Sequence, residues 1–154
     1  MDVKDGVCGR LSVMAPCRPS YAFIEHTGDM GVDLEAPTLG GLFETAAAAL
    51  FEILVQGEAA DRPAASLVVE ASDREALLVE WLNELLYLHT VGGWVLRHFR
   101  VRLQGEAGLR ADVGGERLDP EKHQARREVK AATFHGLHLL HEGGVWRGRV
   151  IFDV

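Results

Sequence analysis

The stretch FIEHTGDMGVDL, residues 23–34, gathers the side chains best suited to chemistry in this sequence. It places Glu25, His26, Asp29 and Asp33 around two glycines, where an apolar segment ends. Carboxylate oxygens are the ligands that hard divalent cations prefer. The bend therefore predicts a cation site with Asp29 as its central residue.

A second carboxylate lies far away in the sequence. Asp153 precedes Val154, whose α-carboxylate is only a few bonds away. If the last strand lies beside the bend, Asp29, Asp153 and Val154 would together supply oxygen ligands for Ca²⁺ or for Mg²⁺ or Mn²⁺. The alternative is that Asp29 caps a turn through its side chain and that Asp153 is a solvated end residue.

Other site chemistries lack their motifs. There is no H-E-x-x-H and no paired cysteine ligand set for zinc, and His135, His138 and His141 would divide between the two faces of a strand. The G-x-S-x-G, G-x-G-x-x-G and Walker A patterns are absent as well. The pair Gly114–Gly115 follows a strand-like segment and leads to no helix, so we expect a turn there.

Composition indicates one globular domain of 154 residues, with 47% hydrophobic and 25% charged residues. No run approaches the ~18 consecutive apolar residues of a membrane span, so we expect a cytoplasmic protein. The net charge of −7 argues against strong direct binding of nucleic acid, which needs a basic surface. Residues 1–19 lack periodicity and are expected to form a loose leader, with free thiols at Cys8 and Cys17.

The remaining residues, 20–154, are expected to form the folded domain. Alternation predicts strands over 20–27 and 30–36, and Thr38 is the expected N-cap of a helix that ends near Val55. A strand over 65–71 precedes a second helix, opened by a capping box of Ser72 and Glu75 and stopped by Gly92–Gly93. The rest of the chain has β character. This order predicts an α+β domain with two helices packed on one face of a largely antiparallel sheet.

Five blocks of the sequence resemble the archease family in order and spacing. They are FIEHTGDMGVDL, TLGGLFETAAAALFEIL, LLVEWLNELLYL, EVKAATFHGL and the terminal VIFDV. Five linked blocks are far more specific than any one of them, and together they span about residues 21–154. The resemblance implies a small domain of the strand-helix-strand-strand type.

The resemblance also implies a function. Archeases are activators of the RtcB-type RNA ligase of tRNA splicing and RNA repair, and are not enzymes themselves. They promote guanylylation of the ligase by GTP, allow repeated turnover, and use a divalent-metal site of acidic residues. Carried onto this chain, the metal ligands are Asp29 and Asp153, while His26, Lys130 and His135 would support the site or face the partner.

Some positions depart from the family pattern, and other functions remain open. Gly28 stands where the family usually has alanine, and Gly40 and Gly41 stand where it has acidic residues, which would remove charge from a partner-facing surface. The family also suggests a chaperone-like partner of a tRNA methyltransferase. A free-standing metal-dependent hydrolase built on Asp29, His26 and Asp153 is the third alternative.

Overall fold

The computed structural model describes residues 17–26 and 28–154, with only the backbone of His26. Its elements are β1 (Ser20–His26), β2 (Asp29–Ala36), α1 (Leu39–Leu54), β3 (Val55–Gln56), β4 (Arg62–Glu70), α2 (Arg74–Thr90), β5 (Trp94–Gln104), β6 (Gly108–Arg117), β7 (Gln124–Ala125), β8 (Ala131–Glu142) and β9 (Val145–Asp153). Cys8 and most of the expected leader lie outside the described residues. Cys17 is disulfide-bonded, so the prediction of a free thiol there is wrong: a low cysteine count does not determine oxidation state.

Side-chain caps begin both helices. Thr38 is the N-cap of α1 as predicted, because its Oγ1 accepts a hydrogen bond from the N–H of Gly41 at 2.9 Å. For α2 the prediction was one residue early. Asp73, not Ser72, accepts from the N–H of Ala76 at 2.8 Å, and its carboxylate also favours the positive end of the helix.

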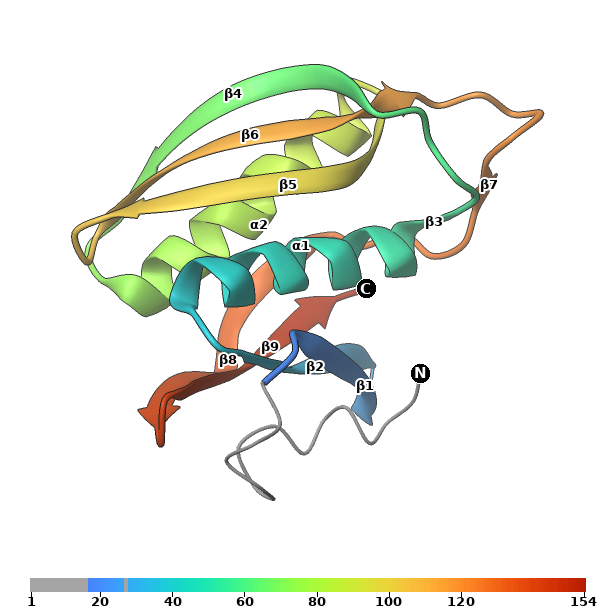
Figure 1. The fold of residues 1–154 in the computed structure, drawn as a ribbon. Helices are drawn as coiled ribbons and strands as arrows, with labels where there is room; N and C mark the ends of the chain where they lie inside the picture. Colours follow the sequence, from blue (N-terminus) through green and yellow to red (C-terminus); the bar gives the residue numbers. More distant parts are fainter. Residues whose placement is uncertain (1–16, 27) are drawn as a thin grey trace.

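The strands divide between two main sheets. The four-stranded sheet has the order β1-β2-β9-β8, the three-stranded sheet has the order β4-β6-β5, and β3 pairs only with β7. All the pairings are antiparallel. Figure 1 shows α1 and α2 as a layer between the two main sheets. The predicted α+β class with two helices is therefore confirmed, whereas the single sheet is replaced by two.

The composition of α1 explains this difference. Its buried residues occupy all of the helix surface except Gly40 and one stripe of Gly41, Glu44, Ala48 and Glu52: Leu39, Leu42, Phe43, Thr45, Ala46, Ala47, Ala49, Leu50, Phe51, Ile53 and Leu54. A helix with so wide an apolar surface must be covered on more than one side. It packs against β5 on one side and β2 on the other, and α2 likewise contacts β8, β4 and β5.

The glycine pair expected to form a turn lies inside β6. Gly114 and Gly115 are buried, and a Cβ on Gly115 would lie 1.9 Å from the carbonyl oxygen of Val95. Here β5 has a register shift between Leu96 and His98 and its backbone comes very close to β6. The glycines are needed for this close approach of two strands.

No helix in the described part of the chain is both long and apolar enough to cross a bilayer.

Substitution of Trp81 in α2 tests the packing of the two helices against each other. Its side chain is fully buried, and its Nε1–H donates to the carbonyl of Phe43 in α1 at 2.9 Å. We expect Trp81→Ala to lower the free energy of unfolding by about 3–5 kcal/mol, since a large cavity would separate the helices. The exposed Val68→Ala should change it by less than about 0.5 kcal/mol. Urea unfolding measures both, and equal effects would contradict this packing.

Candidate metal centre

Asp29 and Asp153 are neighbours across two strands. Asp29 is the first residue of β2, Asp153 is the last residue of β9, and the antiparallel register pairs them directly. Directly opposed residues have Cβ atoms about 4.5–5.5 Å apart on the same face of a sheet. The expectation that the last strand returns to the first bend is confirmed by this register.

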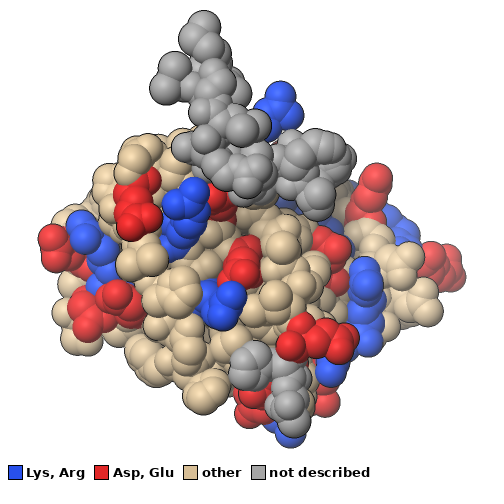
Figure 2. All heavy atoms as spheres, turned by 90° about the horizontal axis from the view of Figure 1, so that it is seen from below, with Lys and Arg blue, Asp and Glu red and all other residues tan. Residues whose placement is uncertain are grey.

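Both side chains belong to the face of the four-stranded sheet that points away from the helices. Val32, Leu34 and Ala36 of β2 enter the core, so the alternating residues Asp29 and Asp33 point outward. Figure 2 views the molecule from this side and shows acidic and basic side chains interspersed.

Arginines of β9 neutralise the other acidic residues on this face of β2. Arg149 lies opposite Asp33, with Nε–Oδ1 at 2.6 Å and Nη2–Oδ2 at 3.1 Å. The hydrogen bond to Asp33 raises the pKa of Arg149. Arg147 lies opposite Glu35, with Nε–Oε2 at 2.7 Å. Asp29 breaks this sequence of ion pairs, because its partner on β9 is a second carboxylate.

Opposed like charges destabilise a strand pair unless a counter-ion lies between them. The donor set at Asp29 and Asp153 consists of hard oxygens, which suits Ca²⁺, Mg²⁺ or Mn²⁺. Asp29 is half-buried and Asp153 is exposed, so the pair opens toward solvent. No three His, Cys, Asp or Glu side chains in the described residues form a metal-binding group. Beyond the two aspartates, the α-carboxylate of Val154, water or a partner's oxygens would complete the coordination.

The other residues predicted for the site, His26, Lys130 and Val154, lie at or beside the ends of three different strands. The backbone of His26 lies opposite Asp29, and its side chain is outside the described structure. Lys130 is exposed, and its backbone N–H donates to the carbonyl of Asp153 at 2.7 Å, which holds the end of β9 in place. Val154 follows the pair, with its half-buried side chain against the core.

His135 lies further along β8. Ala131 is the residue opposite Asp153, while His135 is exposed within the irregular stretch between Thr133 and His138. Its backbone N–H donates to Oγ1 of Thr133 at 3.3 Å. His135 thus lies four residues along β8 from Ala131, in a stretch without regular pairing to β9.

Two polar clusters were missed in the sequence. In the first, the guanidinium of Arg97 donates to the carbonyls of Phe51, Val55 and Gly57 at the end of α1, and burial lowers its pKa. In a pocket of about 400 Å³ beside it, the hydroxyl of Tyr21 donates to the carboxylate of Glu52. Burial, and next this hydrogen bond, raise the pKa of Tyr21.

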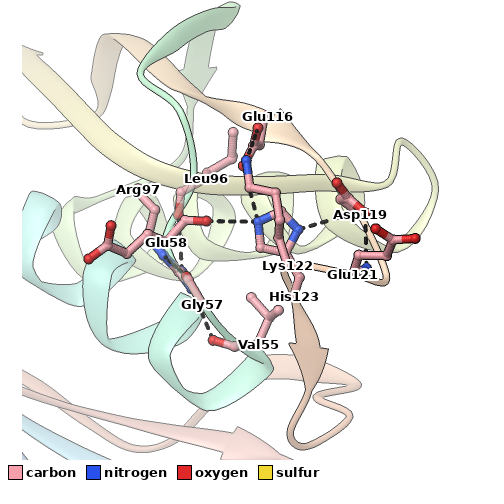
Figure 3. Close-up of polar contacts among 10 residues, drawn as sticks. All are labelled: Val55, Gly57, Glu58, Leu96, Arg97, Glu116, Asp119, Glu121, Lys122 and His123. Atoms are coloured by element: carbon pink, nitrogen blue, oxygen red, sulfur yellow. Dashed lines mark hydrogen bonds and ion pairs between the residues drawn. The ribbon is translucent and has the colours of Figure 1, made fainter.

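The second cluster surrounds the buried His123 (Figure 3). Nδ1 of His123 accepts the N–H of Asp119 at 2.9 Å, which places the ring proton on Nε2. Nε2 faces the carbonyl of Glu58 at 2.9 Å and Oε2 of Glu116 at 3.2 Å. These contacts tie the loop after β6 to the segment after β3. A lone histidine in a loop carries no periodic signal that could have predicted this.

The sequence model of the archease protein family (MTH1598/TM1083) matches residues 21–154. The chain belongs to the archease family. It is 37% identical over 135 residues to a protein archease of Pyrococcus furiosus, covering 84% of this chain and 95% of that one. It is also 35% identical over 139 residues to a protein archease of Methanosarcina acetivorans, covering 87% and 95%.

Two solved structures share the fold. The solution structure of protein 1598 of Methanobacterium thermoautotrophicum superposes with a TM-score of 0.66 at 33% identity, covering 87% of this chain and 98% of that one. The crystal structure of an archease described as a possible chaperone (TM1083), from Thermotoga maritima, gives a TM-score of 0.61 at 23% identity, covering 85% and 94%. The second likeness concerns the fold alone.

Removing one charge tests the repulsion between the aspartates. In the presence of a chelator, Asp153→Asn should raise the free energy of unfolding by roughly 0.2–1 kcal/mol, because Asp29 would no longer face a like charge. Asp33→Asn is the matched control and should lower it, because Arg149 loses its partner. Urea unfolding of both variants measures this. A loss of stability in Asp153→Asn would contradict repulsion between the two aspartates.

Glu116 makes stability depend on pH. The hydrogen bond from Lys122 is the largest cause that lowers its pKa below the usual 4.5. A lowered folded pKa gives stabilisation that is complete above the unfolded value and is lost as pH falls through the folded one. Wild type should therefore exceed Glu116→Gln in stability at neutral pH, and this advantage should shrink in acid. Urea unfolding of both proteins, from neutral pH down into acid, measures the difference in their stability. A difference that stays constant with pH would contradict the assignment.

Proposed function

We propose that this chain is a non-catalytic, divalent-metal-binding activator of an RtcB-type RNA ligase in tRNA splicing or RNA repair. In this role it promotes GTP-dependent guanylylation of the ligase and repeated turnover, in the cytoplasm. Family membership supports the proposal, and the single observation that carries it is the direct opposition of Asp29 and Asp153. A stable fold tolerates such a pair when a cation is bound between the two.

Asp29 and Asp153 would hold the cation, with oxygens from outside this pair completing its coordination. The hydrogen bond from the N–H of Lys130 to the carbonyl of Asp153 fixes the backbone at that ligand. A bound divalent cation supplies positive charge near a leaving pyrophosphate. The open position of the pair allows a partner's groups to approach the same ion.

Charge supports docking as well. The ligase must bind RNA and GTP, both of which require basic surfaces, and this chain has a net charge of −7. Complementary fields accelerate encounter and fix orientation. The two aspartates would then be carried toward the cationic cleft where nucleotide is bound.

A chaperone-like partner of a tRNA methyltransferase is the second candidate. The Thermotoga maritima protein of the same fold is described as a possible chaperone. The described surface also exposes Phe134 and Leu140 of β8, by 59% and 51%. Exposed apolar side chains on an edge strand suit contact with a client protein. This function would not need the aspartate pair.

A free-standing metal-dependent hydrolase built on Asp29, His26 and Asp153 is the third candidate. Turnover of phosphoesters by the isolated protein, without a partner, would support it.

Single-turnover guanylylation of the ligase tests the proposal. Asp29→Ala and Asp153→Ala should each reduce stimulation by more than about tenfold, because a metal's charge stabilisation is worth several kcal/mol. Asp33→Ala, on the same face of the same sheet, is the matched control and should retain stimulation. Stimulation at undiminished levels by both site variants would exclude these carboxylates.

Two further measurements separate the alternatives. A pull-down with the ligase, with and without divalent metal, shows whether the site variants fail in binding or in activation. A methyltransferase solubility assay should be insensitive to Asp29→Ala and Asp153→Ala if the chaperone role is the correct one.

A further inference from the structure

The outer face of the three-stranded sheet is open. The helices cover its inner face, and no described element lies over the outer one (Figure 1). Three exposed arginines project from this face: Arg100 and Arg102 of β5 and Arg110 of β6. They lie in two adjacent rows of the sheet, because Arg100 pairs with Asp112 and Arg102 pairs with Arg110.

The pairing of Arg102 with Arg110 is unfavourable by itself. Val68 completes their row on β4, so neither neighbour in the row supplies a negative charge. Among the described strand pairs, only two oppose full charges of the same sign: Asp29 with Asp153, and Arg102 with Arg110. If the first pair indicates a bound cation, the same physical argument indicates a bound anion at the second.

Asp112, the carboxylate in the row of Arg100, is already engaged. Asp112 accepts from Oγ of Ser66 at 2.8 Å, and its Oδ2 lies 3.5 Å from Nη2 of Arg102. The Ser66 hydrogen bond, followed by the charges of Arg102 and Arg100, lowers the pKa of Asp112. Glu70 lies one row beyond, opposite Gly108. No ion pair involves Arg100 or Arg110 within the described residues.

The geometry of the arginines suits phosphate groups. A guanidinium presents a planar fork of donors that matches phosphate oxygens. Residues two apart on a strand are about 6.6 Å apart, and neighbouring strands about 4.8 Å, so the three charges form a patch and not a point. The patch adjoins a hollow of about 780 Å³ that includes Ser66, His98 and Arg100. A patch of this kind can follow a chain of phosphates.

Aromatic side chains are turned away from this face. Phe99 of β5 points into the core, where it contacts Phe51 and Trp81. Binding of single-stranded nucleic acid by base stacking needs exposed rings. The contact would therefore involve the phosphate backbone and would be independent of sequence.

We propose that Arg100, Arg102 and Arg110 form a phosphate-binding surface for the RNA on which the partner ligase acts. The proposal rests on the proposed function, which brings RNA close to this chain. A net charge of −7 permits only weak contact by the isolated protein. The ligase holds the RNA, and the sheet adds a small number of phosphate contacts at its edge.

Fluorescence anisotropy of a labelled single-stranded RNA, in chelator and over a series of salt concentrations, tests the surface. Three phosphate contacts predict a slope of about −2 for the logarithm of the binding constant against that of salt, and Arg102→Gln/Arg110→Gln should reduce it to about −0.7. Arg126→Gln/Arg127→Gln removes two exposed arginines elsewhere and is the matched control. It should keep the wild-type slope.

Three outcomes would overturn the proposal. Wild type fails to bind RNA even at low salt; the test and control variants weaken binding equally; or labelled polyglutamate binds as tightly as RNA through the same arginines, which would indicate an acidic protein partner. Thermal unfolding confirms that each variant is folded, and loss of an opposed arginine pair should not destabilise the sheet.

Assays with the ligase separate this proposal from the proposed function. Arg102→Gln/Arg110→Gln should leave guanylylation without RNA unchanged and should slow the joining of RNA ends. If wild type does not stimulate guanylylation, the proposed function fails, whatever the anisotropy shows. If wild type stimulates guanylylation but Arg102→Gln/Arg110→Gln does not change the salt dependence of RNA binding, only the phosphate-binding surface fails.

Discussion

The antiparallel pairing of β9 with β2 is the constraint on which the candidate site depends. It joins residues more than a hundred positions apart in the sequence. It also fixes the face of the sheet on which each side chain lies, because a shift of one residue would turn every side chain to the opposite face. The same register buries Val32 beside Val150 and sets Asp33 against Arg149. Core packing and surface charge therefore both keep Asp29 opposite Asp153.

Charge across strands connects the two proposals. A sheet surface is most stable when opposite charges face each other, as Asp33 and Arg149, Glu35 and Arg147, and Arg100 and Asp112 do here. Within the described strands, two pairs depart from this rule, on different sheets and with opposite signs: Asp29 with Asp153, and Arg102 with Arg110. A divalent cation would offset the repulsion within the first pair. A phosphate would add to the one carboxylate, Asp112, that already lies beside Arg102.

Local signals allowed much of the fold to be predicted. Thr38 marked the start of α1, and alternation marked β1 and β2, because caps and periodicity depend on neighbours in sequence. The two-sheet arrangement depends on long-range packing around α1. In sequence, Gly115 resembles a turn residue. In the structure, glycine is needed because a Cβ at this position would lie 1.9 Å from the carbonyl oxygen of Val95. His123 and Arg97 satisfy backbone groups of distant segments, which no local pattern encodes.

Titration calorimetry with Ca²⁺, Mg²⁺ and Mn²⁺ measures whether Asp29 and Asp153 hold a cation. One divalent ion should bind saturably to the wild-type protein, Asp29→Asn/Asp153→Asn should remove this binding, and Asp33→Asn should retain it. Binding that survives in the double variant, or no binding of any of the three ions by the wild type, would contradict the assignment of the aspartate pair as a cation site.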